Sequence, residues 1–314
     1  MQQDFSGKAD TFMEKSRTLK TLLDKLEYEP VQGTLEREIT AVVYDSRKVI
    51  PGCLFICING ANFDGHDFAA QVAAQGVGVL VVQKDIELPA DADVTVIKVA
   101  DTRYAMAFIS AAWFGHPAEK LKVIGITGTK GKTTTTYLVK SILENAGYKV
   151  GLVGTIEVII GDEHIHANNT TPESYLLQEY FARMVDAGLD TVVMEVSSQA
   201  LKYERVGNTH FDTAIFLNIS KDHISPTEHK DFDDYFQSKL KIFDRCTCAC
   251  VNLDSDHIEE ILKAAAKCER VVTFGSKENA VIRVSDIKPG RGKFYFHVAG
   301  PDFSEDFTLP VHGA

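Results

Sequence analysis

Apolar residues along the chain follow two rhythms. Runs of about four to eight apolar residues are typical of buried strands, and apolar residues spaced three and four apart are typical of helices. In the first part of the chain they predict strands at 41–44, 54–58, 77–82 and 94–99 and helices at 16–26, 68–74 and 102–114. This alternation predicts a small α/β domain. His116-Pro117-Ala118 marks its end, because proline disfavours helix in the preceding residue.

The alternation continues in a second region. Strands are predicted at 123–127, 150–153, 191–196, 213–217, 249–252 and 271–274, and helices at 133–146 and 173–187. Gly147 and Gly188 follow these helices, where a left-handed residue often ends a helix. The order predicts a doubly wound, mostly parallel sheet. Strands at 281–284, 293–298 and 307–309, with a turn at 290–292, predict an antiparallel meander at its end.

The composition narrows the classes of partner. The 314 residues suggest about two domains, and a hydrophobic fraction of 45% is ordinary for a soluble protein. A net charge of -11 argues against nucleic acid as a partner. The first 20 residues lack the apolar core of a signal peptide, and no run of about 18 apolar residues could span a bilayer. We therefore expect a cytoplasmic protein that does not bind membranes. We also expect a monomer.

The six cysteines are expected to be reduced thiols in the cytoplasm. Three of them, Cys246, Cys248 and Cys250, form a C-x-C-x-C run that could bind zinc. No second C-x-x-C completes a tetrahedral site, so a strand over 248–252 is the favoured interpretation.

A glycine-rich loop joins strand 123–127 to helix 133–146. It reads Gly128-Thr129-Lys130-Gly131-Lys132-Thr133-Thr134. A loop between a strand and a helix presents backbone N–H groups and a helix N-terminus to phosphates. Lys132 is expected to reach the β- and γ-phosphates of ATP, and the Thr133 hydroxyl to bind Mg²⁺. Ile126 replaces the usual first glycine, and a chance Gly-Lys-Thr in a glycine-rich turn is the alternative.

Polar residues follow two other predicted strands. Glu195 lies at the end of strand 191–196, where a carboxylate could hold Mg²⁺ or cap a helix. The segment from Asn218 to His223 follows strand 213–217, and His223 could be a ligand, a phosphate contact or a structural residue. Lys239, judged without further context, is an ordinary helix lysine.

These motifs together resemble those of the Mur ligase family, and within it the MurE branch. The loop resembles the family's GTxGKTT variant, which accounts for Ile126. Other segments resemble family motifs in the family's order, namely Tyr44-Asp45-Ser46-Arg47 (D-S-R), Asn169-Thr170-Thr171-Pro172 (N-T-T-P), Glu195-Val196-Ser197-Ser198 (E-V-S-S) and Asn218 to His223 (N-x-x-x-D-H). The resemblance covers nearly the whole chain.

The resemblance implies an ATP-dependent amide ligase of peptidoglycan precursor synthesis. ATP would phosphorylate the glutamate carboxylate of UDP-N-acetylmuramoyl-L-alanyl-D-glutamate, and the amine of L-lysine or meso-diaminopimelate would attack the acyl phosphate. It also implies a UDP-substrate domain at 1–118, an ATP-binding domain at 119–314 and an absent C-terminal domain that binds the amino acid. We therefore expect a truncated form that is inactive alone.

The resemblance also implies residue roles. Catalysis would involve Lys132, Lys239, Glu195 and His223. Mg²⁺ would be bound by Thr133, Glu195, His223 and Lys239, the last as N6-carboxylysine formed with carbon dioxide, which requires a neutral amine. ATP would be bound by Gly128, Thr129, Lys130, Gly131, Lys132, Thr133, Thr134 and Asn218. The UDP-substrate would be bound by Ser46, Asn169, Thr170, Thr171, Ser197 and Arg205.

Other functions fit the loop less completely. A small-molecule kinase or NTPase would leave Asp45-Ser46-Arg47 and the 169–172 segment without a role. A non-catalytic nucleotide-binding module would tolerate Lys132→Ala apart from its affinity. Within the family, the MurF, MurT and folyl-polyglutamate types are the alternatives, and the matches at Ser46 and at 169–171 favour MurE.

Overall fold

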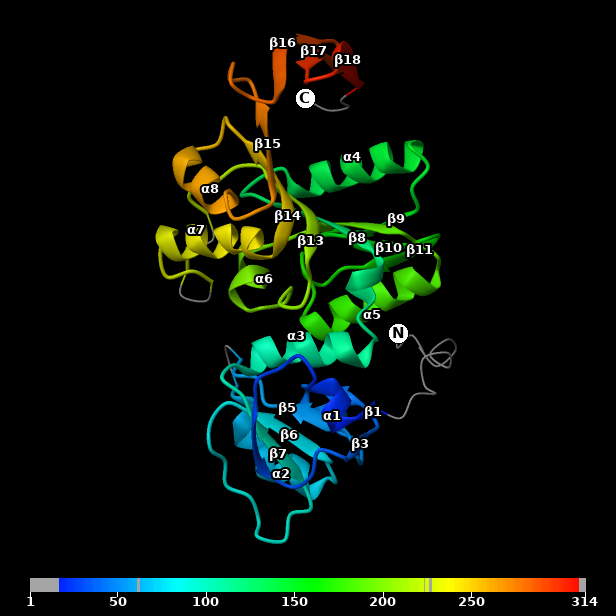
Figure 1. Cartoon of the computed structure of the whole chain (residues 1–314), viewed down its shortest axis with the longest axis vertical. Coiled ribbons are helices and arrows are strands. Elements are labelled where there is room, and N and C mark those ends of the chain that lie inside the picture. The colour runs from blue at the N-terminus through cyan, green and yellow to red at the C-terminus, as the bar shows by residue number, and fades with distance from the viewer. Residues whose placement is uncertain (1–16, 61–62, 223, 226–227, 311–314) are drawn as a thin grey trace. The chain divides into compact units, whose positions relative to one another are not determined.

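The structure is a computed structural model that describes residues 17–60, 63–222, 224–225 and 228–310. It divides into two compact units (Figure 1). The first contains the described residues up to Ala118 together with Glu173–Arg183 and Tyr203–Asn208. The second contains Glu119–Pro172, Met184–Lys202 and the described residues from Thr209 onward. The two later segments of the first unit were not expected from the sequence.

The first unit is built on a five-stranded sheet in the order β2-β7-β6-β5-β4. Its parallel strands are β4 (Val42–Val43), β5 (Leu54–Ile56), β6 (Val79–Val82) and β7 (Thr95–Lys98). The antiparallel edge strand is β2 (Glu29–Gln32), and β1 (Arg17–Thr18) pairs with β3 (Glu38–Ile39). The helices are α1 (Leu19–Leu22), α2 (Ala69–Ala74) and α3 (Thr102–Trp113), with 3-10 turns η1 (Ser46–Lys48), η2 (Gly65–Phe68) and η3 (Pro117–Lys120).

Both faces of this sheet are buried. Leu54 and Ile56 of β5 belong to a cluster with residues of α1 and α3. Phe55, between them, belongs to a second cluster with Val72 of α2. Successive strand residues point to opposite faces, and each such buried side chain contributes about 1.5–3 kcal/mol. A three-layer α/β unit follows, as the alternation predicts.

Two predictions for this unit need correction. The helix expected over 16–26 is only Leu19–Leu22, while Ser16 lies outside the described residues. Leu23 and Leu26 are nevertheless buried, so their spacing serves packing rather than a longer helix. Strand β2 was not predicted, because its four residues are all exposed and include Pro30, which an edge strand tolerates.

The second unit holds an eleven-strand sheet in the order β11-β10-β9-β12-β8-β13-β14-β15-β16-β17-β18. Its parallel strands are β8 (Lys122–Thr127), β9 (Val150–Val153), β12 (Thr191–Glu195), β13 (Phe211–Phe216), β14 (Cys246–Asn252), β15 (Arg270–Gly275) and β16 (Ile282–Gly290). Antiparallel strands flank them, namely β10 (Glu157–Ile160), β11 (Glu163–His166), β17 (Lys293–Ala299) and β18 (Ser304–Pro310).

Helices connect these strands. They are α4 (Lys132–Asn145), α5 (Ser174–Asp186), α6 (Ser198–Lys202), α7 (Phe232–Leu240) and α8 (Ile258–Ala265), with the 3-10 turn η4 (Lys241–Arg245). The part of α5 up to Arg183 belongs to the first unit. Helix α4 covers one face, where Val139 and Leu143 pack on Ile126 of β8 (Figure 1). Strand β8 lies between β12 and β13, so the segments that follow these three parallel strands meet at one edge of the sheet.

The predicted fold class is confirmed. The central parallel sheet and the terminal antiparallel meander are both present, and the meander strands are longer than expected. The β10–β11 hairpin was not predicted. Among the described residues, no helix is long and apolar enough to cross a membrane.

The cysteine run lies in β14, which confirms the predicted strand. The strand begins at Cys246, two residues earlier than expected. All six cysteines are free thiols. Within the described part of the chain, no group of three His, Cys, Asp or Glu side chains is arranged to hold a metal ion.

Candidate active site

The glycine-rich loop of residues 128–134 connects β8 to α4. Gly128 and Gly131 have positive φ values of 153° and 87°. A Cβ at Gly128 would lie 2.9 Å from the Cβ of Leu217, so glycine is required there for space as well as conformation. Helix α4 begins at Lys132, and its N-terminal N–H groups carry positive partial charge toward the loop. The loop therefore has the backbone of an anion-binding site.

Asn218, which follows β13, holds this loop in place. Its side-chain amide donates to the carbonyl of Lys130 at 3.0 Å and accepts from the N–H of Lys130 at 2.9 Å. Its own carbonyl accepts from the N–H of Thr129 at 3.0 Å. Lys130 also forms an ion pair with Asp222 at 2.9 Å. Asn218 was expected beside ATP, and its contacts in the structure are with the loop backbone.

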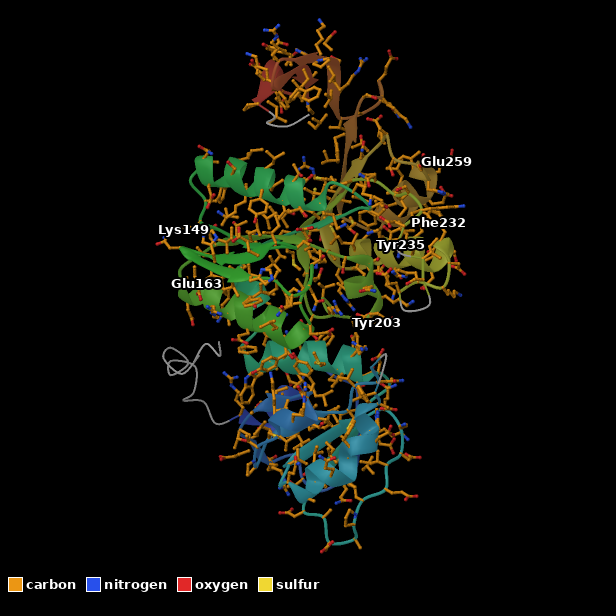
Figure 2. All side chains as sticks on the ribbon, turned by 180° about the vertical axis from the view of Figure 1, so that it is seen from behind. Lys149, Glu163, Tyr203, Phe232, Tyr235 and Glu259 are labelled. Atoms are coloured by element: carbon orange, nitrogen blue, oxygen red, sulfur yellow. The ribbon has the colours of Figure 1, made fainter. Side chains whose placement is uncertain are left out.

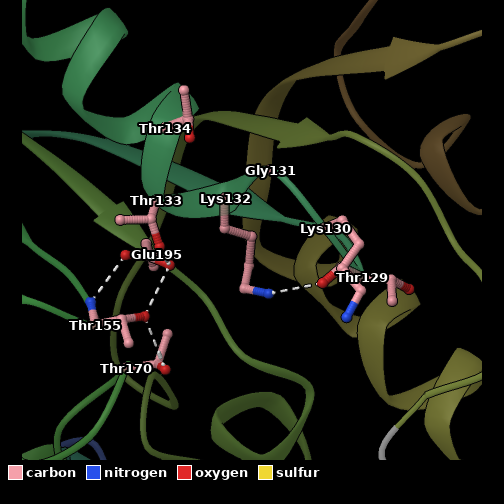
Figure 3. Close-up of a pocket in the computed structure, with 9 residues that line it drawn as sticks. All are labelled: Thr129, Lys130, Gly131, Lys132, Thr133, Thr134, Thr155, Thr170 and Glu195. Atoms are coloured by element: carbon pink, nitrogen blue, oxygen red, sulfur yellow. Dashed lines mark hydrogen bonds between the residues drawn. The ribbon is translucent and has the colours of Figure 1, made fainter. Parts of the chain in front are cut away.

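Glu195 at the end of β12 is the acidic group of the site (Figure 3). Only 1% of its surface is exposed. One carboxylate oxygen, Oε2, accepts from the hydroxyls of Thr133 at 3.0 Å and Thr155 at 3.1 Å. The other, Oε1, accepts from the N–H of Thr155 at 2.8 Å. The carboxylate is thus fixed directly beside the first turn of α4.

These groups line one cavity of about 290 Å³ in the second unit. Its walls are formed by Thr129, Lys130, Gly131, Lys132, Thr133, Thr134, Thr155, Thr170 and Glu195. Thr155 was not expected there. Its hydroxyl lies 3.0 Å from that of Thr170, which links the predicted substrate segment to the carboxylate. No charged side chain or motif pattern marked Thr155, although it follows a strand of the central sheet.

Two lysines converge on one backbone carbonyl. Lys132 Nζ donates to the oxygen of Gly128 at 2.9 Å, and Lys239 Nζ donates to the same oxygen at 3.0 Å. Burial lowers the pKa of Lys132, an effect that Glu195 opposes. Lys239 is 1% exposed, and burial together with the nearby Lys132 charge places its pKa well below the usual value. The structure therefore places Lys239 at the loop rather than on a solvated helix face.

Tyr235, four residues before Lys239 on α7, was also missed. Its hydroxyl lies 3.0 Å from that of Thr129, and Lys239 Nζ lies 4.9 Å from its ring centroid. Residues four apart share a helix face, so Lys239 and Tyr235 are presented to the loop together. This spacing is the signal that could have identified Tyr235.

His229 is a buried histidine close to α7. The predicted His223 lies outside the described residues. His229 is fully buried and contacts the Ser198 hydroxyl at 2.9 Å and Asp234 at 3.2 Å. Burial lowers the pKa of His229, although Asp234 acts in the opposite direction. The contact joins α6 to α7, two helices that border the site.

The predicted substrate segment contributes a buried hydroxyl near Glu195. Thr171 donates to the carbonyl of Glu195 at 2.9 Å and accepts from the N–H of Ser197 at 3.0 Å. The Ser197 hydroxyl accepts from the N–H of Ala200 at 3.1 Å and so caps α6. Asn169 is exposed. Thr170, Thr171 and Ser197 therefore lie around the end of β12.

The other two predicted substrate residues lie in the first unit. Ser46 begins the turn η1, where the Asp45 carboxylate caps the N–H of Arg47 at 3.1 Å. The Arg47 side chain holds the pKa of Asp45 at about 2. Arg205 forms an ion pair with Glu173 at 2.8 Å.

The donor set fits magnesium. Thr133 and Glu195 offer a hydroxyl and a carboxylate oxygen within hydrogen-bond distance of each other, and Mg²⁺ prefers such oxygen ligands. Burial lowers the pKa of the Lys239 amine, which favours the neutral form that carbon dioxide requires. The residues present are therefore compatible with a bound Mg²⁺ ion and with an N6-carboxylysine at position 239.

The loop, the sheet and the carboxylate define a P-loop type of phosphate-binding unit. A family model described as "Mur ligase middle domain" matches residues 126–314, and one described as "Mur ligase family, catalytic domain" matches residues 38–114. The chain belongs to the Mur ligase family, which confirms the family predicted from the motifs.

The curated relatives include proteins named UDP-N-acetylmuramoyl-L-alanyl-D-glutamate–2,6-diaminopimelate ligase. The protein from Clostridium perfringens is 40% identical over 305 residues, which cover 94% of this chain and 60% of that protein. The protein from Clostridium botulinum is 42% identical over 290 residues, which cover 92% and 58%. The chain thus spans about 60% of the length of these relatives.

Solved structures share the fold. A structure of a ligase with the same name has a TM-score of 0.80 at 20% identity and covers 95% of this chain and 60% of that chain. MurF from Acinetobacter baumannii has a TM-score of 0.63 at 24% identity, covering 95% and 62%. MurF ligase from Thermotoga maritima, solved in complex with ADP, has a TM-score of 0.52 at 19% identity, covering 87% and 58%.

Proposed function

We propose that this chain binds ATP and UDP-N-acetylmuramoyl-L-alanyl-D-glutamate for a ligase that joins 2,6-diaminopimelate to the glutamyl carboxylate. The observation that carries the proposal is the contact of Thr133 with the buried Glu195 carboxylate at the start of α4. The names of the relatives support this substrate and favour diaminopimelate over L-lysine. The Thermotoga neighbour, solved with ADP, supports a nucleotide at the loop.

The reaction follows from the chemistry of carboxylates. A carboxylate is a poor electrophile, so one of its oxygens first attacks the γ-phosphorus of ATP and ADP leaves. The amine then attacks the acyl phosphate, phosphate leaves, the nitrogen loses a proton and an amide remains. Lys132 and the N–H groups of residues 128–134 would bind the phosphate oxygens and stabilise the charge that develops on them.

The proposed magnesium ligands are Thr133, Glu195 and the carboxylated Lys239, together with His223. When bound, Mg²⁺ supplies positive charge to the phosphate oxygens. Thr155 and Thr171 hold Glu195 through its carboxylate and its carbonyl, so they keep this ligand oriented. Lys239 would be an N6-carboxylysine, because its buried amine does not favour the charged form.

The proposed division of labour follows the two regions. Residues 1–118, with Ser46, would bind the uridine nucleotide, and residues 119–314 would bind ATP. Thr170, Thr171, Ser197 and Arg205, with Asn169, would bind the muramoyl dipeptide. A UDP-linked precursor of this kind belongs to the cytoplasm, and we propose that the protein works there as a monomer.

Calorimetry tests the two binding sites. We expect the chain to bind Mg-ATP and UDP-N-acetylmuramoyl-L-alanyl-D-glutamate, with UDP-N-acetylglucosamine as a control that lacks the dipeptide. The Lys132→Ala variant should lose its binding of Mg-ATP. The control variant Lys149→Ala should bind Mg-ATP like the wild type, since Lys149 is exposed and projects from the second unit (Figure 2). Absence of dipeptide binding at about millimolar concentration, a free energy near -4 kcal/mol, would refute the substrate.

Trapping experiments separate a ligase from a kinase. With ATP and the dipeptide substrate but no diamino acid, an acyl phosphate would react with hydroxylamine to give a hydroxamate. A kinase that phosphorylates a hydroxyl group would instead accumulate a product that resists hydroxylamine. For Lys239, ¹³C-labelled bicarbonate should give a carbamate signal in the wild type and none in Lys239→Ala.

A further inference from the structure

Glu173 in the first unit lies between two guanidinium groups. Its Oε1 is 2.8 Å from Nη2 of Arg205, and its Oε2 is 3.7 Å from Nη1 of Arg103. The side chains of Arg205, Arg103 and Glu173 are 14%, 22% and 28% exposed. Glu173 directly follows the 169–172 segment and precedes α5. One carboxylate thus faces two arginines in a largely enclosed setting.

Arg103 is held in position by groups other than Glu173. It lies in the first turn of α3, where Asp101 accepts from its N–H at 2.7 Å. Its Nη2 donates to the carbonyl of Asn59 at 3.3 Å, and its guanidinium carbon lies 4.9 Å from the ring centroid of Tyr203. Stacking and the Asn59 bond fix the plane of the guanidinium, so Nη1 still faces Glu173 when the carboxylate moves.

We propose that Arg103 and Arg205 together bind an anionic group of the substrate. In the absence of substrate, the Glu173 carboxylate occupies the position of that anion as an internal counter-ion, and the substrate displaces it. The inference rests on the proposed function and adds Arg103 and Glu173 to it. Two guanidiniums match a two-oxygen anion, because each can donate paired N–H bonds to a carboxylate or a phosphate.

An internal counter-ion explains why Glu173 is present at this position. Partly buried guanidinium groups are costly without a nearby negative charge, so a site for an anion needs a substitute while it is empty. Glu173 is the most exposed of the three side chains, and its rotatable bonds allow the carboxylate to turn toward solvent. A competing anion of this kind lowers the affinity for the ligand that replaces it.

The counter-ion model predicts that two substitutions change affinity in opposite directions. Glu173→Gln removes the competing charge while keeping its shape, so affinity for the UDP-dipeptide should increase about 5-fold, as for one ion pair. Arg103→Gln removes a charge-assisted donor, so affinity should fall about 10-fold or more. Glu259→Gln makes the same change of net charge at an exposed position of α8 and should leave affinity unchanged (Figure 2).

Calorimetry on the 314-residue chain with three ligands identifies the anion. The ligands are UDP, UDP-N-acetylmuramoyl-L-alanine and UDP-N-acetylmuramoyl-L-alanyl-D-glutamate. Tighter binding of all three by Glu173→Gln would assign the diphosphate, and tighter binding of the last alone would assign the glutamyl carboxylate. Either result supports the proposal, and circular dichroism of each variant checks that it is folded.

Other outcomes count against the proposal. Unchanged or weaker binding by Glu173→Gln would mean that Glu173 only orients Arg205, and this would overturn the inference while the proposed function stands. A wild-type chain that binds none of the three ligands would overturn both. Equal losses in Arg103→Gln and Arg103→Lys, with unchanged effects of salt on binding, would show that Arg103 acts through packing alone.

Discussion

Replacing Thr155 by valine removes one hydroxyl from the Glu195 carboxylate and almost preserves the side-chain shape. Glu195 is 1% exposed, so solvent cannot substitute for the lost donor. A hydrogen bond to a charged group contributes about 1.5–3 kcal/mol. Two donors to the Glu195 carboxylate remain, the Thr155 N–H at 2.8 Å from Oε1 and the Thr133 hydroxyl at 3.0 Å from Oε2. We therefore expect the free energy of unfolding to fall by about 1.5 kcal/mol, the lower end of this range.

The same change should weaken Mg-ATP binding. If the hydroxyl orients Glu195 for the metal, a loss of about 1.4 kcal/mol corresponds to about tenfold in affinity. Calorimetric titration with Mg-ATP measures this, and urea unfolding measures the stability. Thr155→Ser keeps the hydroxyl and should bind within about twofold of the wild type. Equal affinities for the valine and serine variants would refute the role of this hydrogen bond.

Three further predictions concern the loop and the buried bases. Gly131→Ala puts a Cβ at a φ of 87° with only ordinary contact to Leu217, so urea unfolding should show a loss of about 1–2 kcal/mol from backbone strain alone. Burial lowers the pKa of Lys239 below the 10.5 of the unfolded chain, so folding releases a proton, and stability relative to Lys239→Met should rise with pH toward 10.5 in carbon dioxide-free buffer. Burial also lowers the pKa of His229 from 6.5, so the wild type should lose stability as pH falls below 6.5, and acid titration followed by circular dichroism should show a smaller loss for His229→Gln.

Much of the second unit could be predicted because local pattern and tertiary burial agree there. The apolar run in β8 and the amphipathic α4 flank a loop whose glycines have the left-handed conformation that the motif requires. The β10–β11 hairpin was missed because β11 is mostly exposed and has no clear apolar alternation. In the first unit, the leucines after α1 are spaced as in a helix, yet tertiary packing buries them without one.

Some residues of the candidate site could likewise be predicted from the sequence, and others could not. Glu195, Lys132 and Thr133 could be named because chemically distinctive residues follow predicted strands or begin a predicted helix. Thr155 could not, since a threonine has many ordinary roles and its partner Glu195 lies 40 residues away in the chain. For Tyr235 the available signal was its spacing of four residues from Lys239, because its partner Thr129 lies 106 residues away. The roles proposed for all of these residues remain predictions for the binding experiments above.

By itself, the sequence determined the α/β class, the glycine-rich loop between a strand and a helix, and the family, because each depends on short-range spacing or on a recognisable motif. Only the tertiary structure decided which side chains meet. The burial of Lys239 against Gly128 and the enclosure of Glu173 by Arg103 and Arg205 both join distant segments. The burial of an ionisable side chain and its distance from other charges set its charge state. Neither quantity can be predicted from the local sequence, because both depend on residues that are far apart in the chain.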